Sequence, residues 1–334
     1  MNLTEIIKEK IVVLDGGMGT MIQNYSLSEA DYRGAAFKEV ALAQKGNNDL
    51  LSITQPQLIE EIHTAYLEAG ADLIETNTFN ANRISMKDYN MEDAVHQMNT
   101  EAVRIAKRAA NKITKRNTDK PRFVVGSLGP TNKTTSISPD INDPSFRDVD
   151  FDEMADVYQE QAQAMLTAGV DALMVETIFD TLNAKAAFYG IQEAMTLTGI
   201  VVPLMASGTI TDKSGRTLSG QTTAAFLISL SHINLFSIGL NCALGATDLL
   251  PYLKTLSDKA PFAISCHPNA GLPNAFGEYD ETPEIMMKNI EPFLEQELVN
   301  IIGGCCGTTP DHTRLMAELA ANYQPRKAKA AVWV

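Results

Sequence analysis

Short apolar runs alternate along this chain with longer segments whose apolar positions have helical spacing. Segment 56–69 is of the second kind, because Leu58, Ile62 and Tyr66 recur every four positions and line one face of a helix. The apolar runs are bounded by turn residues and are typical of buried strands. The predicted strands are 11–14, 72–74, 123–125, 172–175, 201–205, 236–240, 262–265 and 299–302. The predicted helices are 56–69, 91–113, 151–168, 181–197, 220–231, 246–258, 282–297 and a last one that starts near Thr309 and Pro310.

This alternation of eight strands and eight helices fits a single-domain α/β fold, the (β/α)8 TIM barrel, whose active site lies at the carboxyl ends of the strands. A repeated unit supports it, because a helix, an Ala-Gly-x-Asp turn, a strand and a Glu-Thr pair occur at 69–76 and again at 168–177. An open doubly wound sheet is the alternative that periodicity does not exclude.

The predicted barrel spans residues 1–322, and 323–334 is expected to be a basic tail or the start of a linker. Residues 21–54 are expected to be polar and irregular. The long loop 131–150 is interpreted as a lid or a surface excursion.

Composition narrows the class of protein. The 334 residues carry a formal net charge of −14, which argues against a nucleic-acid partner because phosphate binding needs concentrated Lys and Arg. No apolar run reaches the roughly 18 residues of a membrane span, and residues 1–10 have the charged pattern of a helix rather than of a signal peptide. Four irregularly spaced cysteines indicate reduced thiols. We therefore expect a cytoplasmic enzyme that binds neither membranes nor nucleic acid.

The most unusual stretch is Gly303-Gly304-Cys305-Cys306-Gly307, which directly follows the last predicted strand. A third cysteine, Cys242, follows the sixth strand, so a barrel would bring all three thiols to one rim. Three thiolates supply three of the four ligands of a tetrahedral Zn²⁺ and leave one position open, as in catalytic zinc sites. Such a site carries a net charge of −1 and should acidify water weakly, so a substrate thiol suits it better.

Other interpretations of the cysteines and histidines remain open. Cys305 and Cys306 could form a strained disulfide or a redox pair, and Cys242 alone could be a small buried hydrophobe. Cys266 is expected to be a packed or merely nearby thiol, and His267 a structural histidine rather than a ligand. The remaining histidines, His63, His96, His232 and His312, are expected to lie at the surface or to cap helices.

Carboxylates also follow predicted strands, namely Asp15, Glu75 and Glu176. One of them could hold the ammonium group of an amino-acid substrate, and the N–H groups of the turn that contains Gly16 and Gly17 could hold its carboxylate. This turn is not a dinucleotide fingerprint, because the required third glycine is replaced by Ile22. Carboxylates that partner backbone amides or Arg are the structural alternative.

Several motifs together resemble the homocysteine S-methyltransferase family. They are Asp15 to Thr20, Glu75 to Phe79, Gly239 to Cys242, His267 to Gly271 and Gly303 to Thr308. Three further stretches look like the homocysteine-binding module of cobalamin-dependent methionine synthase. These are Lys45 to Asp49, Gly129 to Asn132 and Ser207 to Asp212.

The resemblance implies a (β/α)8 barrel with Zn²⁺ on Cys242, Cys305 and Cys306. It further implies that Glu176 and Asp15 hold the substrate's amino group and backbone, and that Asn269 occupies the fourth zinc position until homocysteine displaces it. Cys266 departs from the family pattern and leaves open an adventitious fourth sulfur.

The activity implied is activation of homocysteine as a thiolate for methyl transfer from methylcobalamin, which yields methionine. The partners would be cobalamin-binding and folate-binding domains of the same or another chain. The alternatives are a stand-alone methyltransferase that uses S-methylmethionine or betaine, and a zinc- and homocysteine-binding module that is inactive without partner domains.

Overall fold

Eight parallel strands form the centre of the molecule in the computed structural model, which describes residues 2–211 and 214–327. They follow the order β1-β8-β7-β6-β5-β4-β3-β2 around the sheet. The sheet closes between its first and last strands, where Leu14 pairs with Leu73 and the Asp15 N–H donates to the Leu73 carbonyl at 3.0 Å. The strands are β1 (Val12–Val13), β2 (Leu73–Glu75), β3 (Phe123–Leu128), β4 (Ala172–Ile178), β5 (Leu204–Gly208), β6 (Ser237–Gly245), β7 (Ala263–Asn269) and β8 (Ile301–Ile302). The predicted barrel is confirmed.

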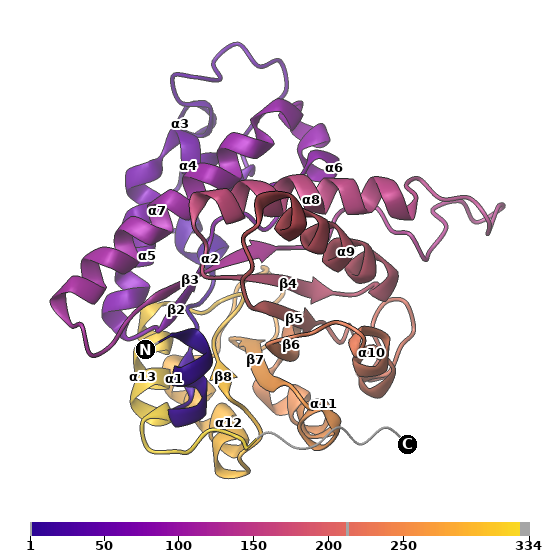
Figure 1. The fold of residues 1–334 in the computed structure, drawn as a ribbon. Helices are drawn as coiled ribbons and strands as arrows, with labels where there is room; N and C mark the ends of the chain where they lie inside the picture. Colours follow the sequence, from indigo (N-terminus) through magenta and orange to yellow (C-terminus); the bar gives the residue numbers. More distant parts are fainter. Residues whose placement is uncertain (1, 212–213, 328–334) are drawn as a thin grey trace.

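Helices surround this barrel (Figure 1). The long ones are α5 (Pro56–Ala69), α7 (Val95–Arg116), α8 (Phe151–Ala168), α9 (Thr181–Thr198), α10 (Thr223–Leu230), α11 (Ala246–Lys259), α12 (Pro283–Glu295) and α13 (Pro310–Ala320). The shorter ones are α1 (Leu3–Glu9), α2 (Met18–Gln23), α3 (Glu29–Arg33), α4 (Leu51–Thr54) and α6 (Arg83–Met86), with single turns at Asn48–Leu50, Lys87–Tyr89 and Glu92–Ala94. None of the helices among the described residues is long and apolar enough to cross a membrane.

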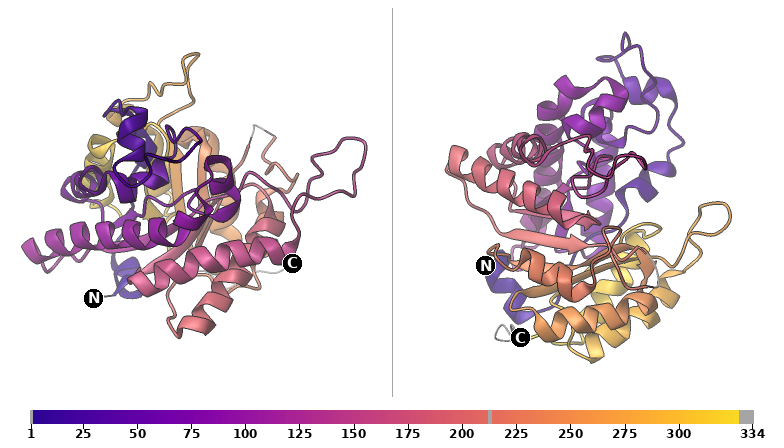
Figure 2. Two further views of the ribbon diagram at one scale, coloured as in Figure 1. Left: turned by 90° about the horizontal axis from the view of Figure 1, so that it is seen from above. Right: turned by 90° about the vertical axis from the view of Figure 1, so that its right-hand side faces the viewer.

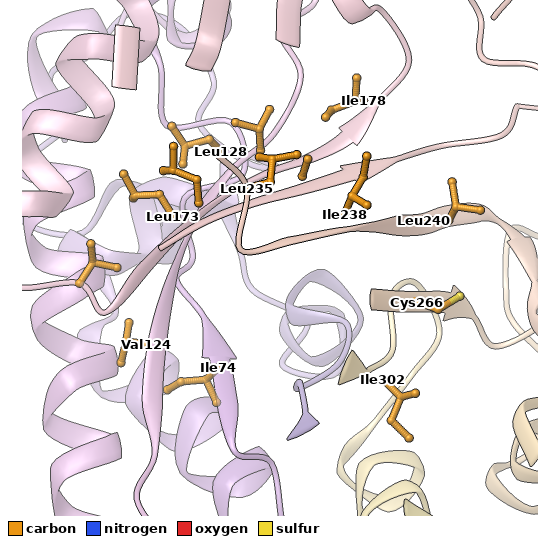
Figure 3. Packing of buried hydrophobic residues seen from close by; sticks show 14 of the residues in the cluster. Ile74, Val124, Leu128, Leu173, Ile178, Leu235, Ile238, Leu240, Cys266 and Ile302 are labelled. Atoms are coloured by element: carbon orange, nitrogen blue, oxygen red, sulfur yellow. The ribbon is translucent and has the colours of Figure 1, made fainter. Parts of the chain in front are cut away.

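The strands sort their side chains into two apolar layers, as period-2 alternation requires. Val12 and Leu14 of the β1 region face the barrel interior, where Leu3 and Ile6 of α1 join the same cluster. Val13 faces outward and belongs to the larger layer between sheet and helices, part of which Figure 3 shows. The barrel is therefore filled by packed side chains, and a site must lie at its rim.

Three local expectations were wrong. Residues 21–54 contain α3, α4 and the end of α2 rather than irregular chain, because local caps such as the Ser28–Asp31 capping box stabilise short helices. The fifth strand begins at Leu204 and not at Val201, since Pro203 has no N–H to donate to a neighbouring strand. β4 and β6 run past their predicted ends through register shifts described below.

The predicted lid or surface loop and the predicted tail differ in how they pack. The loop 131–150 projects from the barrel (Figure 2, left), and Ile141 within it is 96% exposed. In the predicted tail, Arg326 is buried at 3% exposure and donates to the carbonyls of Ser257, Ala260 and Phe262. Asp212, which ends one of the motifs above, and residues 328–334 of the tail lie outside the described residues.

Candidate metal centre and substrate site

Cys242, Cys305 and Cys306 meet at the carboxyl-terminal end of the barrel, with their sulfur atoms within 4.8 Å of one another. The Cys242 and Cys306 sulfurs are 3.9 Å apart. Tetrahedral Zn²⁺ with Zn–S bonds of about 2.3 Å separates its sulfur ligands by roughly 3.8 Å. The three thiols, none of which is in a disulfide, therefore fit a soft metal ion such as Zn²⁺.

An irregularity in β6 brings Cys242 to the other two thiols. Asn241 pairs with His267 of β7, but the next paired residue is Gly245, so the intervening residues leave the ladder. Cys242 and Ala243 there have left-handed φ angles of 61° and 55°. Such conformations cost on the order of 1 kcal/mol or more for residues with a Cβ, and they concentrate at functional sites. The bulge turns the Cys242 side chain toward the cysteine pair.

The turn that carries Cys305 and Cys306 is held by its main chain. The Gly304 N–H donates to the Asp15 carbonyl at 2.9 Å, and the Cys305 N–H donates to the Pro268 carbonyl at 3.0 Å. The Cys306 N–H donates to Asn269 Oδ1 at 3.2 Å. A Cβ on Gly304 would fall 2.3 Å from the side chain of Thr308, so only glycine fits there. Main-chain hydrogen bonds thus hold the turn to Asp15, which follows β1, and to β7.

The three sulfurs share their protons unequally. Hydrogen bonds from Cys242 and Cys305 lower the pKa of Cys306 to about 3. The corresponding bonds to Cys242 and Cys306, together with burial, raise the pKa of Cys305 well above its usual range. A metal ion bound here would compete with protons for the three sulfurs.

Glu176 lies beside the cysteines on a second irregular strand. β4 shifts register between Val175 and Ile178, and Thr177 has a φ of 53°. The Glu176 carboxylate accepts from the Ser127 hydroxyl and, at 3.3 Å, from Asn241 Nδ2. Burial raises its pKa to about 7. The carboxyl group is therefore held in a fixed orientation by its two hydrogen bonds.

Two more carboxyl groups face this site. Burial raises the pKa of Asp15 and of Glu75 well above their usual ranges, and the charge of Glu176 adds to both shifts. Asp15 Oδ2 accepts from the Glu75 N–H at 3.1 Å. Asp15 Oδ1 and Glu75 Oε1 are buried without a hydrogen-bond partner among the described residues. Buried acceptor atoms without a partner favour the binding of a hydrogen-bond donor. A cationic donor would also offset the repulsion among the three carboxyl groups.

The other predicted site residues are Asn269, Gly16 and Gly17. Asn269 lies at the site, where it accepts from the Cys306 main chain, and Gly16 packs against Tyr66 and Thr308. The Gly17 N–H, expected to be available to a substrate carboxylate, instead donates to Thr308 Oγ1 at 3.0 Å. This expectation needs correction, because the residue after the cysteine turn already accepts from that N–H group.

Cys266 and the histidines of the described residues are not part of the three-cysteine group. Cys266 is fully buried in the apolar layer (Figure 3), and His267 is buried on β7 with its pKa lowered to about 3. His312 caps α13, as expected for a capping histidine. His63, however, is completely buried on α5 and not at the surface. Its spacing from Ile59 and Leu67 was the signal that placed it on the buried face.

Sequence reasoning missed Ser127, Asn241 and Tyr279. Asn241 accepts from the Thr177 N–H at 3.0 Å and from Ser207 Oγ at 2.7 Å while it donates to Glu176, so it links the two bulged strands. Its place directly before Cys242 was the available signal. Ser127 lies near the end of β3, next to Gly126, where no motif points to it. Tyr279 carries no motif signal.

Comparison with known proteins bears on the family and the fold. A family profile described as homocysteine S-methyltransferase matches residues 12–320. The metallated form of Escherichia coli homocysteine methyltransferase MmuM is similar in structure, with a TM-score of 0.71, 20% identity and coverage of 96% of this chain and 99% of that chain. Its oxidized form gives a TM-score of 0.71 and 21% identity, with coverage of 93% and 97%. Its apo form gives 0.66 and 20%, with coverage of 94% and 98%. At these identities the structural likeness concerns the fold.

Proposed function

We propose that this chain, which belongs to the homocysteine S-methyltransferase family, methylates the thiol of homocysteine at a zinc centre formed by Cys242, Cys305 and Cys306. The observation that carries the proposal is the convergence of three thiols within 4.8 Å at the barrel mouth. Zn²⁺ held there would lower the pKa of a substrate thiol and keep its sulfur nucleophilic at neutral pH. The homocysteine thiol loses its proton, and its sulfur forms a bond to the methyl carbon of the donor. The bond between that carbon and the rest of the donor breaks, and its electrons stay with the donor.

The protein's own contribution is to hold the amino-acid part of the substrate. The unpartnered oxygens of Asp15 and Glu75, with Glu176 beside them, offer acceptors for an ammonium group. We infer that this group lies among the three carboxyl groups, where its positive charge offsets their repulsion. Fixing both ends of the substrate restricts its sulfur to the metal site, and such positioning lowers the entropic part of the barrier.

The identity of the methyl donor is the second part of the proposal. The first candidate is a separate small donor such as S-methylmethionine or betaine, and it is suggested by the fold shared with a protein named a homocysteine methyltransferase. The second candidate is methylcobalamin carried on a cobalamin-binding domain, and it rests on the synthase-like motifs such as Lys45 to Asp49. A zinc- and homocysteine-binding module without activity of its own is the third.

One experiment separates these donors. The zinc-loaded protein is incubated with homocysteine and, in parallel, with S-methylmethionine, betaine or methylcobalamin, and methionine is quantified. Turnover with a sulfonium or ammonium donor supports the first candidate, and turnover with methylcobalamin alone supports the second. Bound homocysteine without methionine in every arm would overturn the methyltransferase proposal and leave the binding module. Cys305→Ala is the matched negative control.

A further inference from the structure

One buried amide, that of Asn241, lies between the two halves of the proposed site. Asn241 is 1% exposed and is the last residue of β6 that pairs with β7 before the bulge that contains Cys242. β4, β5 and β6 are neighbours in the sheet (Figure 1). The Asn241 side chain spans all three strands, because it bonds to Thr177 of β4 and to Ser207 of β5. It therefore relates the position of one strand end to that of the next.

The partners of the amide determine which of its two ends faces the site. The Asn241 oxygen must be the atom that accepts from the Thr177 N–H at 3.0 Å, because a main-chain N–H can only donate. Ser207 Oγ donates to the same oxygen at 2.7 Å. The NH₂ group donates to Thr177 Oγ1 at 2.9 Å and to Glu176 Oε2 at 3.3 Å, and it lies 4.0 Å from Cys305 Sγ. It thus lies between a carboxylate of the proposed ammonium site and a sulfur of the proposed metal site.

The same amide holds the bulge of β4 that directs Glu176. Thr177 has a φ of 53°, and residues with a Cβ keep such left-handed conformations only where their surroundings impose them. Both the N–H and the hydroxyl of Thr177 bond to the Asn241 amide. On its own strand, Asn241 directly precedes Cys242, whose φ of 61° begins the second bulge. Asn241 thus links the segment that positions Glu176 to the segment that carries Cys242.

We propose that Asn241 is a positioning residue that sets the separation between the ammonium site and the metal site, and that it thereby selects homocysteine over cysteine. This inference rests on the proposed function, because it takes Glu176 as a partner of the ammonium group and the three thiols as metal ligands. Homocysteine has two methylene groups between its Cα and its sulfur, and cysteine has one. If the separation is fixed, the shorter amino acid cannot reach both sites at once. A missing methylene group commonly lowers affinity about 10- to 200-fold, and the wild type should prefer homocysteine by a factor in this range.

Asn241→Ala and Ser207→Ala test this inference at two strengths. Asn241→Ala removes the amide from between Glu176 and Cys305, so the two sites can move relative to each other. Ser207→Ala is milder, because it keeps the amide and deletes a hydroxyl that donates to its oxygen. Each zinc-loaded protein is titrated calorimetrically with homocysteine, alone and in competition with cysteine, and the affinities are compared at equal zinc content. The readout is the ratio of the two dissociation constants, which a general loss of stability does not change.

Asn300→Ala is the matched control, because it also removes a buried amide that joins neighbouring segments. Asn300 accepts from the Ile264 N–H at 3.0 Å and donates to the Arg326 carbonyl at 2.7 Å. It directly precedes β8, so it lies at the opposite end of the barrel from Cys305. Loss of this amide should lower stability and leave the preference for homocysteine at the wild-type value.

In Asn241→Ala, homocysteine binding is expected to weaken by about tenfold and cysteine binding by less than about threefold, so the preference for homocysteine falls. Ser207→Ala should lower the preference by about two- to threefold, and it carries the test if Asn241→Ala does not fold. Equal weakening of both amino acids, or a preference unchanged in Ser207→Ala and in folded Asn241→Ala, would overturn the inference. Equal affinity of the wild type for the two amino acids would also overturn it. A wild-type protein that binds neither zinc nor homocysteine would contradict the proposed function instead, so the two failures are distinguishable.

Discussion

Replacement of Glu176 by Gln tests the ammonium site with little change in shape. The carboxylate accepts from Ser127 Oγ and from Asn241 Nδ2. Gln can keep its oxygen toward Asn241 and turn its NH₂ toward Ser127, because a hydroxyl also accepts. The fold and the three thiols should therefore stay intact, and the variant loses mainly the negative charge that faces the substrate.

The size of the effect follows from that one interaction. A hydrogen bond between a carboxylate and a charged donor contributes about 1.5–3 kcal/mol. Since each factor of ten in affinity corresponds to about 1.4 kcal/mol, Glu176→Gln should weaken homocysteine binding roughly 10- to 150-fold. Asp15 and Glu75 remain as acceptors in the variant, so binding should weaken without disappearing.

Isothermal titration calorimetry with homocysteine at pH 8 measures this difference, and zinc analysis of the same samples checks the metal. Glu278→Gln, a change of an exposed carboxylate on the nearby hairpin, is the control and should bind as the wild type does. Wild-type affinity in Glu176→Gln with zinc intact would refute the assignment of Glu176 to the ammonium group.

Three further predictions concern metal and stability. Cys242→Ala should lose most of its zinc, as metal analysis would show. Cys266→Ala should retain its zinc and lose about 1 kcal/mol of unfolding free energy, as metal analysis and denaturant unfolding would show. Zinc retained in Cys242→Ala and lost from Cys266→Ala would exclude the assigned ligands. Burial lowers the pKa of His63 from its usual 6.5 to about 3, so the unfolded chain binds the proton and stability is lost as pH falls below about 6.5. Between pH 7 and pH 5 the loss of unfolding free energy should be about 2 kcal/mol smaller in His63→Leu than in the wild type. Equal losses in the two proteins would show that His63 does not titrate on unfolding. Arg326→Met should cost about 3 kcal/mol or more in urea unfolding, because it leaves buried carbonyls of Ser257 and Ala260 without their donor; a loss below about 1 kcal/mol would contradict this.

The sequence predicted the strands well because burial on both sides makes them continuous apolar runs. The order of strands around a barrel then placed Cys242 and the Cys305–Cys306 pair at one rim without knowledge of side-chain geometry. Local boundaries were less predictable. β5 starts later than predicted because Pro203 has no N–H to donate to a neighbouring strand. The pairing of β5 with β4 shows where the strand begins.

The details of the site depended on features that no short motif encodes. Thr177, Cys242 and Ala243 adopt left-handed φ angles without being glycines, and the surrounding registers of β4 and β6 impose them. These bulges decide where Glu176 and Cys242 point. Tyr279 packs against Gly307, beside Cys306, from the connection between β7 and α12, so its proximity is a property of the tertiary structure.

Zinc K-edge X-ray absorption tests the central claim most directly, because it counts the sulfur neighbours of the metal. In the zinc-loaded protein alone, the account predicts three sulfurs at about 2.3 Å and one lighter neighbour. After addition of homocysteine it predicts four sulfurs. A sulfur count that stays the same when homocysteine binds, or fewer than three sulfurs at the start, would contradict the three-thiolate site and its role in binding the substrate thiol.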